Sequence, residues 1–496
     1  MLAPYWLNLK RKVTFAQFFK RTTDMVFSSN VFLLYFLPLF LVCYFAFPKS
    51  CRNIVLLLFS ILFYAYGAPD FVLLLIGSTI ANFYLVNAMQ KAKTIRTKKL
   101  FCAVAISISI GLLVYYKYAN FFVDNINAVL SVFGIDGFAI SKIILPIGIS
   151  FFSFQSVTYV VDTYRGVSQP MKRLTDYILY IMMFPQLIAG PIVRYCDISS
   201  QLTDRKYNAV ECLHGVYRFI IGLCKKVLVA DVVGTQADKW FSGDLAALDS
   251  GTAWIAIVAY TMQLYFDFSG YSDMAIGLGR IMGFRFPENF DNPYNSTSVS
   301  EFWRRWHITL GTFMRNYLYI PLGGNRCPKG RVFFNLWVTF LLSGFWHGAS
   351  WNFVVWGAYH GFWLILERMG LSNLQQKIGK IPSVVLTFIV VVVGWSIFRT
   401  ETLADAGTFI SRLFAFDFSG FSLTASRQFY TILLVALMFS FFTLAPIGKK
   451  IHDKVFYSEY SVCGHVVAWM ASVVLFVLVL GALNAVGFSP FIYFRF

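Results

Sequence analysis

The amino-acid sequence predicts an all-α polytopic membrane protein. Its 496 residues are 58% hydrophobic and only 13% charged, whereas soluble domains carry about 25% charged residues. The mean hydropathy is +0.63. Apolar runs close to membrane-spanning length follow one another along most of the chain. These three observations together exclude an ordinary soluble protein.

The apolar runs define the expected helices. A spanning helix needs about 20 residues, and several of the runs are shorter. We therefore expect roughly eleven true spans, with the remaining runs forming tilted, re-entrant or interfacial helices. The runs are residues 31–47, 54–68, 71–89, 100–116, 143–161, 177–193, 212–234, 253–268, 332–346, 351–366, 382–398, 430–446 and 465–485.

The basic residues indicate part of the topology. The formal net charge is +18, and in a membrane protein such an excess is typical of cytoplasmic connectors. The run of basic residues from Lys91 to Lys99 is expected inside the cell, after a hairpin that turns at Pro69-Asp70. The connector 304–331 is expected on the same side. Because the basic residues fall in short connectors, nucleic-acid binding is not indicated.

The first 24 residues differ from the rest of the chain. Residues 1–24 carry five basic side chains among aromatic ones, a pattern typical of an amphipathic surface helix. The charge pattern places Met25 outside the cell, which conflicts with these basic residues. Residues 1–24 are therefore interpreted as a basic extension that either lies upstream of the true start or lies on the outer surface. Residues 25–496 form the transmembrane domain.

No cofactor motif or metal site is predicted. The eight cysteines are scattered without a C-x-x-C pair, so neither a disulfide framework nor a zinc site is indicated. No P-loop or G-x-S-x-G motif occurs. The glycines between Gly277 and Gly283 have the wrong spacing for a dinucleotide fingerprint, and they indicate close helix packing instead. We expect no metal and no permanently bound cofactor.

His347 is the first candidate catalytic residue. It follows an apolar run, Trp346 and Trp351 flank it, and Gly344 and Gly348 would allow a backbone or a ligand to come close. A neutral imidazole in a water-poor site is a base at neutral pH, and this suits proton removal from a hydroxyl that attacks a thioester. The alternative is a core histidine bonded to a carbonyl, and the residues alone do not separate the two.

A second candidate group lies in the polar segment 301–307. On a helix, Trp303 and His307 would share a face at i, i+4. The segment is interpreted as an interfacial helix that enters a polar cavity, and the alternative is an aromatic-belt helix whose arginines meet lipid phosphates. In the functional interpretation the donor-binding residues are Trp303 and the phosphate clamps Arg304, Arg305 and Arg315.

The polar residues between 267 and 273 are supporting candidates. Asp267, Ser269 and Asp273 come at the end of an apolar run, so each carboxylate must meet a cation, water or backbone donors. The simpler expectation is an ion pair with an arginine of the connector 304–331. The other histidines are interpreted as structural, with His360 the most plausible exception.

At these motifs the chain resembles the membrane-bound O-acyltransferases (MBOAT), and more narrowly the alginate O-acetyltransferase (AlgI) type of subunit. The similar stretches are FDFSGYSDMAIGLGRIMGFRFPENFDNPY, EFWRRWHITL, RNYLYIPLGGNR and WHGASW, together with the ending PFIYFRF. The likeness extends from Met25 to the end. The resemblance implies an MBOAT-type helical fold in which His347 is the essential histidine and His307 its partner across a tunnel.

The resemblance also implies a function. It predicts an enzyme of the bacterial inner membrane that takes acetyl from a cytoplasmic donor, acetyl-CoA. The acetyl group would serve O-acetylation of an exported polysaccharide, most plausibly alginate, through a periplasmic O-acetyltransferase partner. Trp346, Trp351 and the 267–273 residues would line or support the tunnel.

Two rival functions stay open at this point. One is acyl transfer to another acceptor, namely cellulose, peptidoglycan or, with D-alanine, teichoic acid. The other is a polysaccharide exporter, which would carry polar residues along several helices. Here the polar groups are concentrated in one stretch, which favours the enzyme.

Overall fold

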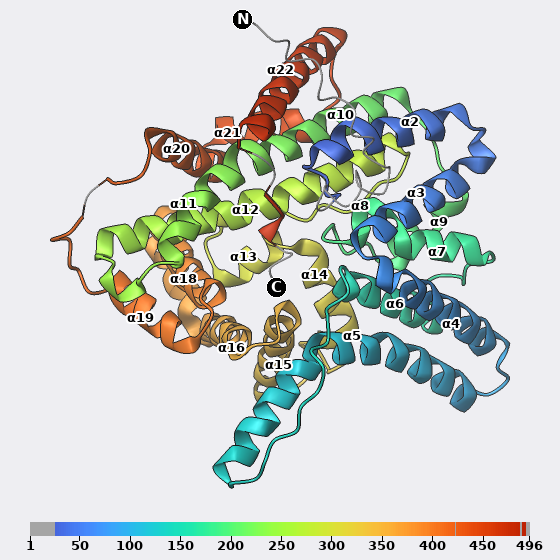
Figure 1. The fold of residues 1–496 in the computed structure, drawn as a ribbon, viewed down its shortest axis with the longest axis horizontal. Helices are drawn as coiled ribbons and strands as arrows, with labels where there is room; N and C mark the ends of the chain where they lie inside the picture. The colour runs from blue at the N-terminus through green and yellow to red at the C-terminus, as the bar shows by residue number, and fades with distance from the viewer. Residues whose placement is uncertain (1–24, 422, 487–488, 493–496) are drawn as a thin grey trace, which may run out of the picture.

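The computed structural model describes residues 25–421, 423–486 and 489–492, and every regular element in them is helical. This confirms the predicted fold class (Figure 1). The predicted extension 1–24 and the last four residues of the chain lie outside the described residues. Six described helices are long and apolar enough to span a membrane, fewer than the expected spans. They cover Lys49–Gly67, Pro69–Lys91, Ile95–Val132, Lys380–Arg399, Arg427–Leu444 and Val462–Ala485.

The first helices form a peripheral group. The 3-10 turn Pro69–Phe71 joins the second and third of them, which confirms the predicted hairpin. The last helix of the group has 38 residues, about 57 Å at 1.5 Å per residue, and it extends well beyond the predicted run 100–116. The helices are α2 (Leu37–Ala46), α3 (Arg52–Gly67), α4 (Val72–Lys91) and α5 (Ile95–Val132).

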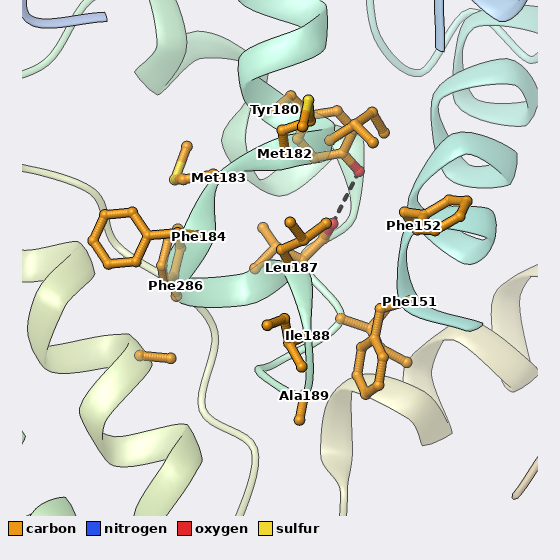
Figure 2. Close-up of a cluster of buried hydrophobic side chains, with 14 of the residues drawn as sticks. Phe151, Phe152, Tyr180, Met182, Met183, Phe184, Leu187, Ile188, Ala189 and Phe286 are labelled. Atoms are coloured by element: carbon orange, nitrogen blue, oxygen red, sulfur yellow. Dashed lines mark hydrogen bonds between the residues drawn. The ribbon is translucent and has the colours of Figure 1, made fainter. Parts of the chain in front are cut away.

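The central helices are shorter and mostly buried. The apolar run 177–193 is interrupted, because its helix ends at Met182 and a second, four-residue helix follows. Figure 2 shows side chains of this break packed with Phe151 and Phe152 of the neighbouring helix. The helices are α6 (Ile149–Tyr164), α7 (Leu174–Met182), α8 (Phe184–Leu187), α9 (Tyr195–Thr203), α10 (Ala209–Cys224), α11 (Asp231–Phe241) and α12 (Ser250–Ile281), with the π-helical turn η4 (Lys225–Ala230) between α10 and α11.

Helices α10 and α12 are in backbone contact through glycines. A Cβ atom on Gly277 would lie 2.6 Å from the carbonyl oxygen of Gly215, and one on Gly270 would lie 2.7 Å from that of Gly222. Real Cβ contacts are never so short, so only glycine fits these positions. This confirms the prediction of close helix packing from Gly277.

The remaining helices complete the fold around α12. Four of them, α13 (Val299–Arg305), α14 (Ile308–Phe313), α15 (Lys329–His347) and α16 (Trp351–Leu366), carry the candidate site. The others are α17 (Ser372–Ile378), α18 (Lys380–Arg399), α19 (Leu403–Leu413), α20 (Arg427–Phe441), α21 (Pro446–Phe456) and α22 (Val462–Val486).

The core lies at α6 and α12, and the long apolar helices surround it. Almost every residue of α12 from Ala256 to Gly279 is buried. By contrast, five of the six candidate spans are at most 28% buried over their apolar window, and only α18 reaches 61%. Apolar side chains exposed on outer helices are those expected to face lipid. The molecule therefore has a closed centre in which polar residues need protein partners.

Candidate active site

The two predicted catalytic histidines meet at one indole. His347 is the last residue of α15, and His307 precedes α14. The Trp346 ring lies 4.9 Å from the His347 ring and 6.2 Å from the His307 ring, measured between centroids. Both imidazoles are buried, His307 at 1% and His347 at 7% exposure. The structure therefore brings together residues forty positions apart in the chain.

His307 occupies a strained backbone position. The chain leaves helix α13 at Trp306, which is extended, and His307 has a left-handed conformation with φ 45°. Left-handed non-glycine residues often occur at functional sites and are held by their surroundings. The predicted pairing of Trp303 and His307 on one helical face is therefore wrong, because the helix ends between them.

Asn289 fixes the orientation of the His307 ring. The Asn289 Oδ1 atom lies 3.0 Å from His307 Nδ1 and accepts hydrogen bonds from the Thr309 hydroxyl at 2.8 Å and the Thr309 N–H at 3.3 Å. The Asn289 Nδ2 donates to Ser272 Oγ at 3.0 Å. The Thr309 hydroxyl in turn accepts from the Ile192 N–H at 3.0 Å. Asn289 thereby links His307 to α12, α14 and the segment after α8.

The same network sets the tautomer of His307. A backbone N–H can only donate, so the atom that receives the Thr309 N–H must be the amide oxygen of Asn289. His307 Nδ1 must then carry the proton that it donates to this oxygen. In the neutral ring the lone pair therefore lies on Nε2, which has no hydrogen-bond partner among the described residues. His307 presents a free proton acceptor.

His347 is placed by the contact between α15 and α16. Gly344 and Gly357 face each other across this contact, and a Cβ atom at either would collide with backbone of the other helix. The His347 ring packs against Trp356 of α16 at 5.2 Å and Phe398 of α18 at 5.4 Å. The imidazole is thus enclosed by aromatic side chains from three helices.

Lys117 of α5 binds the end of α15 beside His347. Its Nζ donates to the carbonyl oxygens of Trp346 at 2.5 Å and His347 at 3.0 Å, and to Ser150 Oγ at 3.4 Å. The neighbouring Tyr118 hydroxyl donates to the Phe345 carbonyl at 2.9 Å. An ammonium group has three N–H donors, so all three are used. A cation at the carbonyl end of a helix is favourable, and here it fixes the turn that carries His347.

The supporting carboxylates are held in ion pairs, but not with the predicted partners. Asp267 pairs with Lys226 at 2.6 Å. Asp273 pairs with Arg218 and with Lys225, each at 2.6 Å. The expectation of arginine partners from the connector 304–331 is wrong, because α10 and η4 supply cations directly beside α12.

Asp267 also anchors the C-terminal segment. Its Oδ2 accepts from the Ile492 N–H at 2.9 Å, and its partner Lys226 donates to the Pro490 carbonyl at 3.1 Å. Segment 489–492 thus lies against α12 in the middle of the molecule. Ser269 is buried near by, and its hydroxyl has no hydrogen-bond partner among the described residues.

The three candidate clamp arginines lie in different surroundings. Arg305 is paired with Glu301 at 2.8 Å. Burial raises the pKa of the Glu301 carboxyl, but hydrogen bonds from Thr297 and the charge of Arg305 outweigh burial and hold it below the usual value. Arg304 is exposed and lines a polar cavity, and Arg315 is exposed in the turn after α14. The structure therefore does not gather the three guanidinium groups into one site.

The three candidate tryptophans also lie in different places. Trp346 is near the rings of both His347 and His307. Trp303 contacts the ring of His360 at 4.9 Å and that of Trp356 at 5.5 Å. Trp351 is 54% exposed and donates from Nε1 to Asn125 Oδ1 at 2.9 Å. Trp351 therefore lies outside the aromatic group around His347.

Sequence reasoning missed Asn289 and Lys117. Lys117 carried a usable signal, because it ends the long apolar run of α5 without a nearby acidic residue. Asn289 is one of several polar residues in its segment, and the sequence contains no sign of its contact with His307. Among the described residues, no group of three or more histidines, cysteines or acidic side chains could hold a metal ion.

The arrangement can perform proton transfer in a water-poor site. Two buried imidazoles lie at a shared indole, one with an unengaged lone pair on Nε2. General-base catalysis requires such an acceptor within hydrogen-bond reach of the reacting hydroxyl. Fold and site define a multi-pass membrane protein whose centre holds residues that can transfer a proton.

Comparisons with known proteins place this chain among enzymes of that kind. The model of the "MBOAT, membrane-bound O-acyltransferase family" matches residues 164–398. The chain is 41% identical to the "Probable alginate O-acetylase AlgI" of Pseudomonas putida, over 95% of this chain and 100% of that protein. It is 44% identical to the protein of the same name in Pseudomonas aeruginosa, over 85% of this chain and 82% of that protein.

A further relative carries a different name. The "Peptidoglycan O-acetyltransferase" of Helicobacter pylori is 35% identical over 78% of this chain and 79% of that protein. The chain belongs to the membrane-bound O-acyltransferase family. It is an O-acyltransferase of the membrane, which confirms the enzyme class that the sequence motifs predicted.

Proposed function

We propose that this enzyme transfers acetyl groups from a cytoplasmic donor, acetyl-CoA, across the bacterial inner membrane for O-acetylation of an exported polysaccharide. Alginate is the proposed polymer, because the relatives that match nearly the whole chain are named for alginate O-acetylation. A periplasmic O-acetyltransferase would then modify the polymer. Acetyl-CoA is a substrate in this proposal, and no group stays bound.

The observation that carries the proposal is the buried pair of imidazoles at Trp346. His347 would remove the proton from the acceptor hydroxyl as its oxygen attacks the thioester carbon. The C–O bond forms and the C–S bond breaks, and the proton is passed on to the departing thiolate. Enclosure by aromatic rings excludes water that would otherwise hydrolyse the thioester.

The Asn289 contact changes the role proposed for His307. As the partner of His347, this ring could orient the donor carbonyl or steady developing negative charge, but either role needs an N–H donor at the substrate. With its proton on Nδ1, neutral His307 offers a lone pair at Nε2 instead. We assign it a second proton-acceptor position, and only its protonated form would steady negative charge.

The test is the acetyl content of alginate in a producer strain that lacks its own acetylase and expresses this chain. His347→Ala should reduce acetylation at least about 100-fold, the usual contribution of a general base. His214→Ala is the matched control, because His214 is a histidine outside the aromatic group and should leave acetylation unchanged. Wild-type acetylation by His347→Ala at equal protein abundance would remove the catalytic assignment.

The acceptor and donor need a separate experiment. Vesicles with purified enzyme and radiolabelled acetyl-CoA should release free coenzyme A only when a hydroxyl acceptor or partner protein is present. Transfer of D-alanine from a carrier, with none from acetyl-CoA, would replace acetylation by the teichoic-acid type of reaction. Movement of polymer into empty vesicles would instead favour an exporter.

A further inference from the structure

A polar cavity of about 440 Å³ lies at the start of α13, beside α17 and the beginning of α18. It differs from the aromatic centre, since hydroxyls, amides and cations line it. The lining residues are Thr297, Ser298, Ser300, Arg304, Ser372, Gln375, Gln376, Gly379, Lys380 and Ser383. No acidic residue is among them.

The residues that line this cavity include two cations and no acid. Arg304 and Lys380 are both exposed, and neither is in an ion pair among the described residues. Lys380 also lines a neighbouring cavity that contains Asp291, Glu301 and Asp453, but no described acid is within ion-pair distance of it. Asp291 lies 3.9 Å from Arg305, and Asp453 lies 3.3 Å from His452. Glu301 pairs with Arg305, and buried Glu367 accepts the N–H groups of Val299 and Ser300, so that it caps α13. The cavity thus offers two free cations to a ligand.

The start of α18 adds to this potential. This helix has 20 residues and begins at Lys380 after Gly379, whose φ is 88°. The first N–H groups of a helix have no partner within it and favour an anion. Because α18 begins at the cavity wall, its dipole and the two cations act on the same volume.

A hydrogen-bond acceptor without a partner in this cavity indicates a ligand that carries donor groups as well as an anionic group. Gln375 is 6% exposed, lines the cavity, and its Oε1 atom has no hydrogen-bond partner among the described residues. A phosphate without hydrogens cannot satisfy an acceptor. The organic part of a phosphate ester can, through a hydroxyl or an amide N–H. The lining therefore matches an ester that has both anionic and donor groups.

We propose that this cavity binds the phosphate groups of the acyl donor, with Arg304 and Lys380 as the anion contacts and Gln375 as acceptor for the organic part. The inference rests on the proposed function. Helix α13 connects the two places, because Arg304 belongs to it and His307 follows two residues after its end. A soluble phosphate ester held here would have its position fixed relative to the catalytic histidines.

The structure also distinguishes among the arginines predicted from sequence. Arg305 is neutralised by Glu301, and Arg315 lies outside the residues that line this cavity. Lys380 lies 76 positions after Arg304 in the chain, outside the motif that contains the arginines. The donor contact is thus one arginine and one lysine from different helices.

The test measures coenzyme A binding to the full chain in lipid nanodiscs by calorimetry. Arg304→Gln and Lys380→Gln should each weaken binding about tenfold or more, because each removes a charge-assisted contact with phosphate. Lys377→Gln is the matched control, because Lys377 is an exposed cation of α17 that does not line the cavity. This control should leave the Kd within twofold. The affinity of the Arg304→Gln and Lys380→Gln variants for coenzyme A should depend less on salt concentration than that of the wild type.

Lipid phosphate is the alternative source of the same chemistry. Nanodiscs made with phosphatidylglycerol and with phosphatidylcholine alone separate the two. If the Gln variants bind coenzyme A as tightly as wild type, the proposal is overturned. Loss of bound phosphatidylglycerol in the same variants would then assign the cavity to a lipid headgroup.

The outcome is independent of the catalytic assignment. His347→Ala should bind coenzyme A as wild type does while losing acetylation. Normal acetylation by His347→Ala, together with weakened binding by Arg304→Gln, would overturn the proposed function and leave the cavity as a donor site. Lost acetylation by His347→Ala, with coenzyme A binding unchanged in Arg304→Gln and Lys380→Gln, would overturn the cavity alone.

Discussion

The proton on His307 Nδ1 depends on a single acceptor, the side-chain oxygen of Asn289. Replacing Asn289 by Leu would leave His307 Nδ1–H and the Thr309 hydroxyl without this partner in a buried place. An unsatisfied buried donor costs about 1–3 kcal/mol. The ring would then adopt other orientations and tautomers.

We predict that Asn289→Leu lowers polymer acetylation about tenfold or more at equal abundance. Ser272→Ala is the control, because it removes only the partner of Asn289 Nδ2 and keeps the contact to His307. It should have a clearly smaller effect. If the two variants acetylate equally well, the orientation of His307 does not depend on Asn289.

Lys117 acts on His347 through the backbone. Lys117→Met removes two hydrogen bonds at the end of α15 and one to Ser150 of α6, and it also removes a buried charge whose desolvation is costly. We therefore expect kcat to fall about tenfold while KM for the donor and the melting temperature change little. Lys117→Arg should recover most of the activity, because it keeps the cation and its donors.

Purified enzyme in nanodiscs gives the kinetic constants, and scanning fluorimetry gives the melting temperature. A loss of activity that follows the loss of thermal stability in both variants would make Lys117 a purely structural residue. The histidines themselves were predictable from sequence because each stands in a short, unusual motif. Lys117 and Asn289 act through contacts that depend on the fold.

At the scale of helices, the α10–α12 contact offers no room for a side chain at Gly277. Gly277→Leu would force the backbones apart at a site where a Cβ already lies 2.6 Å from the Gly215 oxygen. Overpacking usually costs about 1–3 kcal/mol or more. Asp273 and its partner Arg218 lie on the same pair of helices, so their ion pair would also be disturbed.

We predict that Gly277→Leu lowers the temperature of aggregation, measured by fluorescence size-exclusion chromatography after heating. Gly111→Leu is the matched control, since Gly111 lies in α5 and a Cβ there would meet nothing within 4 Å. It should leave the aggregation temperature unchanged or higher. Equal behaviour of the two variants would contradict the close contact.

Helix existence was predictable along most of the chain, whereas several boundaries were not. The predicted run 253–268 ends one residue after Asp267, whereas helix α12 continues to Ile281. The helix can continue because Lys226 pairs with Asp267, and Arg218 and Lys225 pair with Asp273. Those cations come from about fifty positions earlier. The break after Met182 had a local signal, since Pro185 is tolerated in the first turn of a helix, as in α8, but not in a helix interior.

At the scale of the whole molecule, the sequence predicted a helical membrane protein because composition and apolar runs are properties of the entire chain. Six described helices are long and apolar enough to span a membrane, fewer than the roughly eleven spans expected. Several buried runs form short helices that satisfy their polar groups against one another, as Asn289, Thr309 and His307 do. Such interruptions are tolerated at membrane depth only where protein covers them.

The charge pattern makes a prediction about topology that the helices allow to be tested. Pro69–Phe71 forms the turn between α3 and α4, and Lys93 follows α4, so Asp70 and Lys93 lie at opposite ends of one helix. The basic residues place Lys93 and Arg326 in the cytoplasm and Asp70 outside. All three side chains are exposed.

We therefore expect Asp70→Cys to react with a membrane-impermeant maleimide in intact spheroplasts. Lys93→Cys and Arg326→Cys should react only after lysis. The background is a chain with Cys463 replaced, because it is the one exposed cysteine among the described residues. Labelling of position 93 from outside would show that the orientation in the membrane is the reverse of the predicted one. The cavity at Arg304 would then face the wrong side for a cytoplasmic donor. Labelling of 93 and 326 from opposite sides would instead require an odd number of membrane crossings between α4 and α15.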